Sequence, residues 1–324
     1  MTDESPQAHK PAPAGRSTEP AKPVPAAKPG RQGTTAALPK DPGAKAPATA
    51  APAPEQPGAP PWWRTLRADA PLLVRVAIGL AALGVLGVVW WFVTRGDPTE
   101  AIVSPAKLKS PGQVFGSFAA LLERDLVGNI LATLWRVLVG VGLGALVGIG
   151  LGVGAGSYRS VAAAINPAVI FLRSVPMGAL LPFTIYWFGI YETQKSMFIF
   201  LAVVPFVFSD TVKAISAVPQ RYVETAQTLG ASRFQIIRKV LFPLAVPDIV
   251  TSLRFQFGLA LGYITLAEAI NPTAGIGFLL NSGEREGHLE QNYLLLFIIA
   301  LIALGIDLGI RFFQRGLFHY RKDL

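Results

Sequence analysis

The apolar run Leu72–Val93 is the feature that most constrains how this chain can fold. A helix needs about 20 apolar residues to cross the hydrocarbon core of a bilayer, which is about 30 Å thick. Further apolar segments follow at about 130–155, 165–188, 197–215, 249–270 and 293–313. The sequence therefore predicts an all-α, polytopic membrane protein with about six transmembrane helices.

The composition argues against a soluble protein and against several kinds of site. Only 15% of the 324 residues are charged, whereas soluble domains carry about a quarter. Lys and Arg flank the apolar segments instead of forming one basic face, so no nucleic-acid partner is expected. The chain has no cysteine, which excludes disulfides and thiolate ligands. His9, His288 and His319 are too far apart in sequence to suggest a metal site.

Residues 1–60 are rich in Pro and Ala and have almost no large apolar side chains. Such a segment cannot bury enough surface to offset its ordering entropy, so a disordered tail is predicted. A solvated extension is favoured over a tether to anionic lipid. The next unit, 61–110, holds an interfacial anchor at Trp62 and Trp63, the first transmembrane helix and a connecting segment.

Charge between the apolar segments predicts the orientation. Six spans put both termini on one side, together with the loop that carries Arg221, Arg233, Arg238 and Lys239. Loops on the other side contain several acidic residues and a short turn at 191–195, although they also contain cations. By the positive-inside rule, both termini are predicted to be cytoplasmic.

Glycine and proline shape two of the spans. Pro167, Pro176 and Pro182 predict that the segment 165–188 is kinked or broken. In the preceding span, small residues recur every four positions, which predicts close packing of this helix against a neighbour. They are Gly140, Gly144, Gly148, Gly152 and Gly156.

A polar interruption between two apolar segments has strong helix-boundary signals. Pro219 can begin a short helix over 220–229, and Gly230 is placed for a left-handed C-terminal cap. Ser232 and Gln235 have capping-box spacing for a second helix. That helix is expected to end before Pro243, so that the interruption forms a helix–Gly–helix elbow at the membrane surface.

The same interruption carries a recognisable pattern: Glu224-Thr225-Ala226, then Gly230, then Val240-Leu241-Phe242-Pro243. It resembles the cytoplasmic EAA loop of ABC-importer permeases at every spacing. Other segments are similar to the nitrate/sulfonate/taurine branch of that family, and the resemblance covers about residues 110–320. These segments are Arg173-Ser174-Val175-Pro176, Trp187-Phe188-Gly189, Ala267-Glu268 and Gly275-Ile276-Gly277.

The resemblance implies a type I ABC-importer permease fold over 111–324, with a coupling loop at 218–243. Two permease copies, forming a homodimer, would make the path in a bacterial inner membrane, two ATPase subunits would dock on the coupling loops, and a periplasmic binding protein would deliver the solute. ATP would be bound by the ATPase, and this chain would hold no cofactor and perform no catalysis. The implied coupling residues are Glu224, Thr225, Ala226, Leu229, Gly230 and Pro243.

Polar residues inside spans are candidates for the translocation path, because they usually face a bundle interior or a water-filled route. Arg173, Glu268 and Tyr263 are the candidates. Glu268 has an equally good structural interpretation as a buried hydrogen-bond partner. Arg136 either lines the path or snorkels to the surface. At Gly262-Tyr263 the sequence departs from the branch, which usually has tryptophan near this point.

Two other classes remain open on the sequence alone. A secondary transporter or channel would work without an ATPase, but such carriers often have matching Gly/Pro breaks in two halves, and the Pro-rich third segment has no evident twin. A membrane scaffold or sensor would act through the 1–60 tail. The resemblance implies a small anionic or zwitterionic solute, and the sequence does not identify which one.

Overall fold

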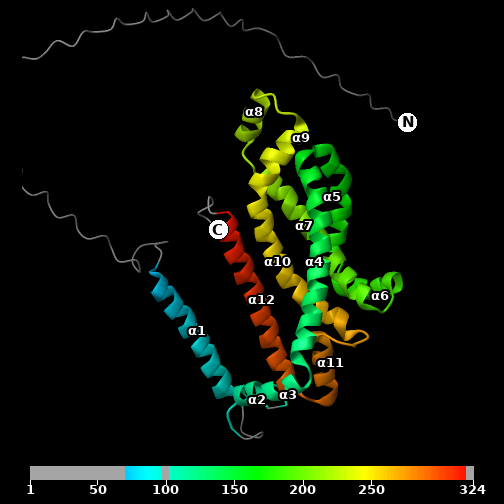
Figure 1. The fold of residues 1–324 in the computed structure, drawn as a ribbon. Helices are drawn as coiled ribbons and strands as arrows, with labels where there is room; N and C mark the ends of the chain where they lie inside the picture. Colours follow the sequence, from blue (N-terminus) through cyan, green and yellow to red (C-terminus); the bar gives the residue numbers. More distant parts are fainter. Residues whose placement is uncertain (1–69, 97–101, 105, 319–324) are drawn as a thin grey trace, which may run out of the picture. The chain divides into compact units, whose positions relative to one another are not determined.

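The computed structural model describes residues 70–96, 102–104 and 106–318, and no described residue lies in a strand. The predicted 1–60 tail and the Trp62-Trp63 anchor lie outside the described residues. The all-α prediction is confirmed. Figure 1 shows long helices side by side, with α8 and α9 at one end and α2, α3 and α11 at the other.

Of the described helices, four are long and apolar enough to cross a membrane: α1 (Leu72–Val93), α4 (Leu126–Ser157), α7 (Glu192–Ser216) and α12 (Leu289–Leu317). The pair α5 (Arg159–Ser174) and α6 (Met177–Phe188) adds a fifth candidate if it is one broken span. The remaining predicted span corresponds to α10 (Phe242–Ala269), which carries Asp248, Arg254 and Glu268. Its 28 residues give it a length of about 42 Å.

The shorter helices join these long ones. They are α2 (Pro111–Gly116), α3 (Phe118–Glu123), α8 (Gln220–Thr228), α9 (Arg233–Ile236), the π-helical segment η1 (Ile237–Leu241) and α11 (Ile276–Glu286). Helix α1 has no buried residue. It meets the rest of the described chain near its end, where Trp90 stacks on Phe297 and donates to the carbonyl of Lys109.

The predicted break in the third segment is confirmed. Helices α5 and α6 meet at 105°, and the bend lies at Val175 and Pro176, which are both extended. The residue before a proline is pushed out of the helical region, so the chain turns here. Pro167 and Pro182 lie inside helices that continue through them.

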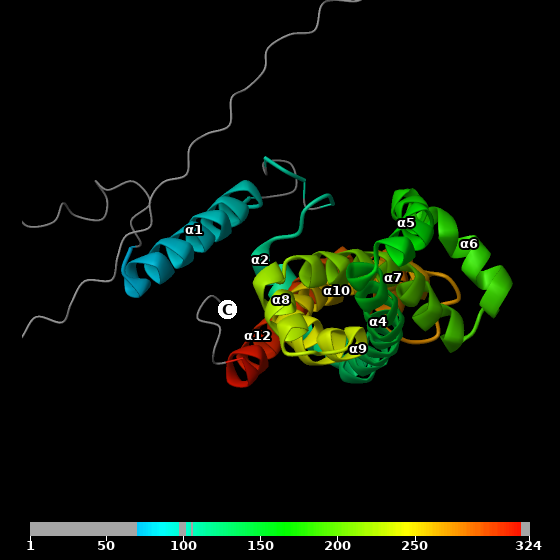
Figure 2. The same ribbon diagram turned by 90° about the horizontal axis from the view of Figure 1, so that it is seen from above.

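Close packing along the glycine ridge of α4 is also confirmed, and the partner is α7. Ile199, Val203, Val207, Thr211 and Ile215 of α7 lie opposite successive ridge glycines. A Cβ atom at Gly152 would lie 2.6 Å from the Cβ of Thr211, and one at Gly156 would lie 2.7 Å from the Cβ of Ile215. Small residues thus let two helix backbones approach closely inside the bilayer, where the hydrophobic effect does not drive helix association. Figure 2 looks along this pair from above.

Two predicted boundaries are wrong. The second elbow helix does not end before Pro243, because α9, η1 and α10 follow one another without a break and Pro243 lies in the first turn of α10. A proline has no N–H to donate, and in the first turn of a helix this N–H is not needed. The segment 191–195 is not a turn, since α7 begins at Glu192 and buries Gln194 and Lys195.

Candidate functional site

The elbow between α8 and α9 has the predicted helix–Gly–helix form. Gly230 has φ +76°, its N–H donates to the carbonyl of Gln227 at 2.9 Å, and the N–H of Ala231 donates to the carbonyl of Ala226 at 3.0 Å. These two bonds are those of a Schellman motif. They satisfy carbonyls at the end of α8 and set the angle at which the chain leaves it.

The second helix begins with the predicted capping box. The Ser232 N–H donates to the side-chain oxygen of Gln235 at 2.8 Å, and the Gln235 N–H donates to the Ser232 hydroxyl at 3.4 Å. Both helix ends at the elbow are therefore held by local hydrogen bonds. Helix α9 then continues through η1 into α10, so the elbow is joined rigidly to a long helix.

Five of the predicted coupling residues lie on α8 or at its end, and the sixth, Pro243, lies in the first turn of α10. Leu229 is 82% exposed, Glu224, Thr225, Gly230 and Pro243 are exposed, and Ala226 is half-buried. The Thr225 hydroxyl donates to the carbonyl of Arg221, which satisfies it within α8. Glu224 makes no ion pair with any residue that the structure describes. This face therefore has an apolar group and a charge available for a partner.

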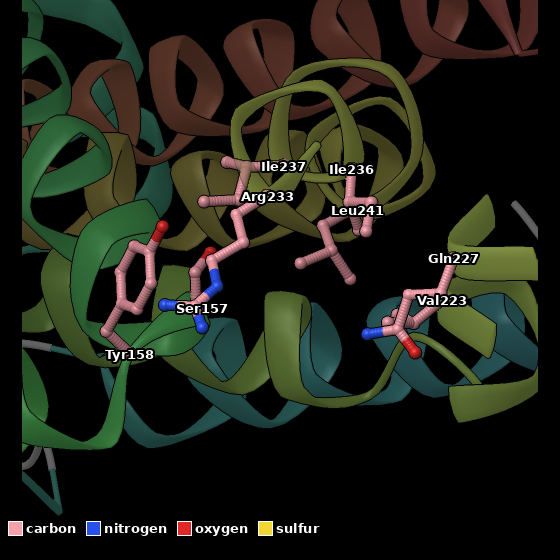
Figure 3. Close-up of a pocket in the computed structure, with 8 residues that line it drawn as sticks. All are labelled: Ser157, Tyr158, Val223, Gln227, Arg233, Ile236, Ile237 and Leu241. Atoms are coloured by element: carbon pink, nitrogen blue, oxygen red, sulfur yellow. The ribbon is translucent and has the colours of Figure 1, made fainter. Parts of the chain in front are cut away.

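A cavity of about 280 Å³ lies on the inner side of the elbow (Figure 3). Ser157 and Tyr158, where α4 meets α5, form one side of it, and Val223 and Gln227 of α8 lie across from them. The Ser157 hydroxyl is buried without a hydrogen-bond partner. Helix α8 is thus not packed tightly against the helices behind it. The remaining lining comes from Arg233, Ile236, Ile237 and Leu241.

A second group of polar residues is buried between α4, α7, α10 and α11. The side chain of Glu268 is 0% exposed and that of Arg136 is 4% exposed, and they pair at 2.6 Å. The Thr133 hydroxyl donates to the Glu268 carboxylate at 2.8 Å. Arg136 also donates to the carbonyl of Ala274 at 2.8 Å. Buried charges of this kind are costly unless paired and hydrogen-bonded, and this pair is both.

The start of α11 is fixed by the same group. Successive N–H groups of Gly275, Ile276 and Gly277 donate to the side chains of Asn129, Thr133 and Glu268 at 2.7, 2.8 and 2.8 Å. Gly275 has φ +113°, and a Cβ there would lie 2.4 Å from the carboxyl carbon of Glu268. The Gly-Ile-Gly sequence is therefore required by the close approach of the chain to a buried carboxylate.

Glu192 and Lys195 complete this group, and sequence analysis missed both as site residues. Glu192 accepts from Arg136 through both carboxylate oxygens, at 2.5 and 2.8 Å, and from Lys195 at 3.1 Å. Lys195 is 1% exposed at its side chain, whereas Glu192 is 61% exposed. Their spacing on the first turn of α7 is i, i+3, but the segment reads as a polar turn until the helix boundary is known.

The three predicted path residues lie in separate surroundings. The Arg173 guanidinium lies 4.9 Å from the ring centre of Phe206, and Tyr263 meets the ring of Phe198 edge-on at 6.4 Å. Within the described part of the chain, no hydrogen bond or ion pair joins either residue to Glu268. The complete burial of Glu268 supports its structural interpretation, while the path roles of all three residues stay predictions.

Polar residues nearer the elbow end pair with one another. Arg254 and Asp307 form an ion pair at 2.8 Å between α10 and α12, and Asp210 pairs with Lys213 at 3.2 Å within α7.

The described residues contain no group of three His, Asp or Glu side chains that could hold a metal ion.

Comparison with known proteins assigns the family. Residues 140–319 match the family described as binding-protein-dependent transport system inner membrane component. The chain belongs to this family. It is thus an ABC transporter permease, and the match includes the elbow, the π-helical segment and the start of α11.

Two relatives agree with the branch indicated by the sequence motifs. The permease is 32% identical over 260 residues to the taurine transport system permease protein TauC of Escherichia coli, covering 78% of this chain and 93% of TauC. It is 31% identical over 255 residues to the nitrate import permease protein NrtB of Synechocystis, covering 75% of this chain and 89% of NrtB. The predicted similarity to the nitrate/sulfonate/taurine branch is confirmed.

A solved structure supports the fold. An inward-facing conformation of the MetNI methionine ABC transporter matches with a TM-score of 0.52 and 25% sequence identity. The match covers 59% of this permease and 95% of that chain. The predicted type I importer permease fold is therefore confirmed.

Proposed function

We propose that this permease is the membrane subunit of an ATP-driven importer for a small anionic or zwitterionic solute such as taurine, another sulfonate or nitrate. The observation that carries the proposal is the α8–Gly230–α9 elbow. It exposes Leu229 and Glu224 at one end of the helices and continues without a break into α10. A docking element of this kind needs an exposed anchor and a stiff connection.

The elbow would couple a partner ATPase to the membrane helices. Two ATPase subunits would bind ATP, and each would receive α8 in a groove, with Leu229 and Ala226 as apolar contacts and Glu224 as a charged one. Since α9, η1 and α10 are continuous, a displacement of α8 would move α10. Nucleotide shifts the transporter between states only if it binds one state better, and the elbow would carry that difference.

Charge supports a cytoplasmic position for the elbow. Arg221, Arg233, Arg238 and Lys239 all lie on α8, α9 or η1, and cytoplasmic loops carry an excess of such residues. The chain would then lie in the bacterial inner membrane with both termini in the cytoplasm. A periplasmic binding protein would deliver the solute at the opposite end, and a second copy of the permease would complete the path.

Reconstitution of the assembled transporter tests this function. The permease, ATPase subunit and binding protein are placed in proteoliposomes, and uptake of labelled taurine and nitrate is measured with ATP, with ADP and without the ATPase. We expect uptake of at least one solute by the complete transporter with ATP, and no uptake with ADP or without the ATPase. Uptake that persists without the ATPase would instead indicate a secondary transporter or channel.

The docking role of the elbow is tested by Glu224→Lys, with Glu123→Lys as its matched control. Glu123 is an exposed glutamate on α3, at the other end of the helices. We expect Glu224→Lys to reduce both ATPase association and uptake by about tenfold or more, within the usual range of coupling energies. Glu123→Lys should leave ATPase association unchanged. Equal association of both variants would contradict the docking role.

A further inference from the structure

The charged group at the start of α7 contains three nitrogen donors that converge on one carboxylate. Arg136 Nε, Arg136 Nη2 and Lys195 Nζ all point at the Glu192 carboxylate, at 2.5, 2.8 and 3.1 Å. We define these three nitrogen donors as the anion cradle. Both cations that supply it are almost fully buried, and they come from two different helices.

The number of donors and acceptors is unequal in the cradle. One Glu192 oxygen accepts from Arg136 Nε, and the other accepts from both Arg136 Nη2 and Lys195 Nζ. A sulfonate or a nitrate has three equivalent oxygens, so each donor would have an oxygen of its own. Charge-assisted hydrogen bonds from Arg or Lys to anionic oxygens are among the strongest hydrogen bonds in proteins.

Charge balance permits Glu192 to be replaced. Arg136 and Lys195 contribute two positive charges, and Glu268 and Glu192 contribute two negative ones. If the Glu192 side chain turned into water and a monovalent anion took its place, the group would stay neutral. Loss of Glu192 without replacement would leave a buried cation uncompensated, which is strongly unfavourable.

Exposure shows which carboxylate is replaceable. Glu268 is 0% exposed and is held by Thr133, Arg136 and the Gly277 N–H. Glu192 is 61% exposed, and the hydrogen bonds that its carboxylate accepts from described residues all come from the cradle. Glu192 can therefore leave without unpacking the helices, and the cradle is reached from its exposed side.

We propose that Arg136 and Lys195 form a binding site for a three-oxygen anion, which Glu192 occupies as an internal substitute until the anion displaces it. The inference rests on the proposed function, because it assigns the anionic group of the transported solute to this site. The charged group is then neutral whether Glu192 or the solute anion occupies the cradle. Because Glu192 competes with the solute, the site does not hold the anion too tightly for its release during transport.

The test measures anion binding to the purified full-length permease by its thermal unfolding midpoint. Wild type, Glu192→Ala and Glu192→Gln are titrated with sodium ethanesulfonate, nitrate, acetate and chloride at constant ionic strength. We expect ethanesulfonate and nitrate to raise the midpoint of both variants at concentrations about tenfold or more below those needed for wild type, since removing an internal competitor raises apparent affinity. Acetate, with two oxygens, and chloride should act more weakly.

The matched control is Glu286→Ala. Glu286 is a half-exposed carboxylate that pairs with Arg124, so its removal frees a cation without opening the cradle. We expect Glu286→Ala to respond as wild type does. The double variant Glu192→Ala/Lys195→Met should lose the gain in affinity. Equal responses of Glu192→Ala and wild type, or equal effects of ethanesulfonate and chloride on Glu192→Ala, would overturn the proposal.

Chemical rescue covers the case in which Glu192→Ala does not fold in ordinary buffer. Extraction in sodium ethanesulfonate should then recover folded protein, whereas equimolar sodium chloride should not. Failure of this rescue, together with an unchanged response of Glu192→Gln, would also overturn the proposal. ATP-dependent uptake by the wild-type importer is measured separately, so the cradle can fail while the proposed function stands.

Discussion

Arg136 of α4 and Glu268 of α10 form an ion pair of 2.6 Å whose side chains are 4% and 0% exposed. The pair also fixes the start of α11, because Glu268 accepts the N–H of Gly277 and Arg136 donates to the carbonyl of Ala274. Three helices and a connection therefore depend on one buried charge interaction.

Replacement of Arg136 by Met should strongly destabilise the permease. Removing one partner of a buried pair leaves the other charge uncompensated, and the expected loss is about 3–5 kcal/mol. The control is Arg311→Met, because Arg311 pairs with Asp307 at an exposed position. That change should cost less than about 1 kcal/mol. Denaturant unfolding in detergent measures both, and equal losses would contradict a structural role for the buried pair.

Gly275→Ala should destabilise more than Gly287→Ala. Both glycines have positive φ, +113° and +80°, and an alanine in such sparsely populated backbone conformations costs about 1–3 kcal/mol. At Gly275 the new Cβ also overlaps the Glu268 carboxylate, whereas nothing lies within 4 Å at Gly287. This overlap should add about 1–3 kcal/mol. The difference between the two unfolding free energies is the measurement, and its absence would mean that Glu268 moves aside freely.

Two neighbouring glycines of α4 test the packing against α7. At Gly152 a Cβ would lie 2.6 Å from Thr211, and at Gly150 it would meet nothing within 4 Å. Gly152→Ala should therefore cost about 1–3 kcal/mol through overpacking. Gly150→Ala should be neutral or stabilise by up to about 1 kcal/mol, because alanine favours helix. Thermal unfolding of both variants decides whether the ridge is in contact.

The elbow could be predicted because its signals are local. The Gly230 cap and the Ser232 capping box each depend on residues within six positions of one another, so their hydrogen bonds follow from spacing. The end before Pro243 was predicted wrongly because a proline also fits the first turn of a helix. The π-helical segment η1 joins α9 to α10 without a break.

The buried charge group could not be predicted, because its partners are distant in sequence. Arg136 lies 56 residues from Glu192 and 132 from Glu268, and no periodic pattern links them. Arg136 and Glu268 were candidates only as charges inside apolar segments. The apolar pattern predicts that this helix begins at about 197, whereas it begins five residues earlier, at Glu192. Glu192 and Lys195 therefore look like loop residues in the sequence. Which residues join the buried charge group depends on how α4 is aligned against α7. The glycine spacing indicates that α4 packs closely on a neighbour, but it does not show which residues of the two helices lie opposite one another.

Gly230→Pro should separate coupling from folding. Proline cannot adopt the φ of +76° at this position, and it removes the N–H that donates to Gln227. The matched control is Gly287→Pro, since Gly287 ends α11 with the same pair of cap bonds at the other end of the helices, to Glu284 and from His288 to Gly283.

Both proline variants should lose similar stability, because each breaks one helix cap. We expect Gly230→Pro alone to lose ATPase association, and its ATP-dependent uptake to fall by about tenfold or more. Co-purification with the ATPase and uptake by proteoliposomes measure these effects. If Gly287→Pro loses ATPase association equally, the loss reflects general instability, and the angle set at Gly230 has no specific part in docking.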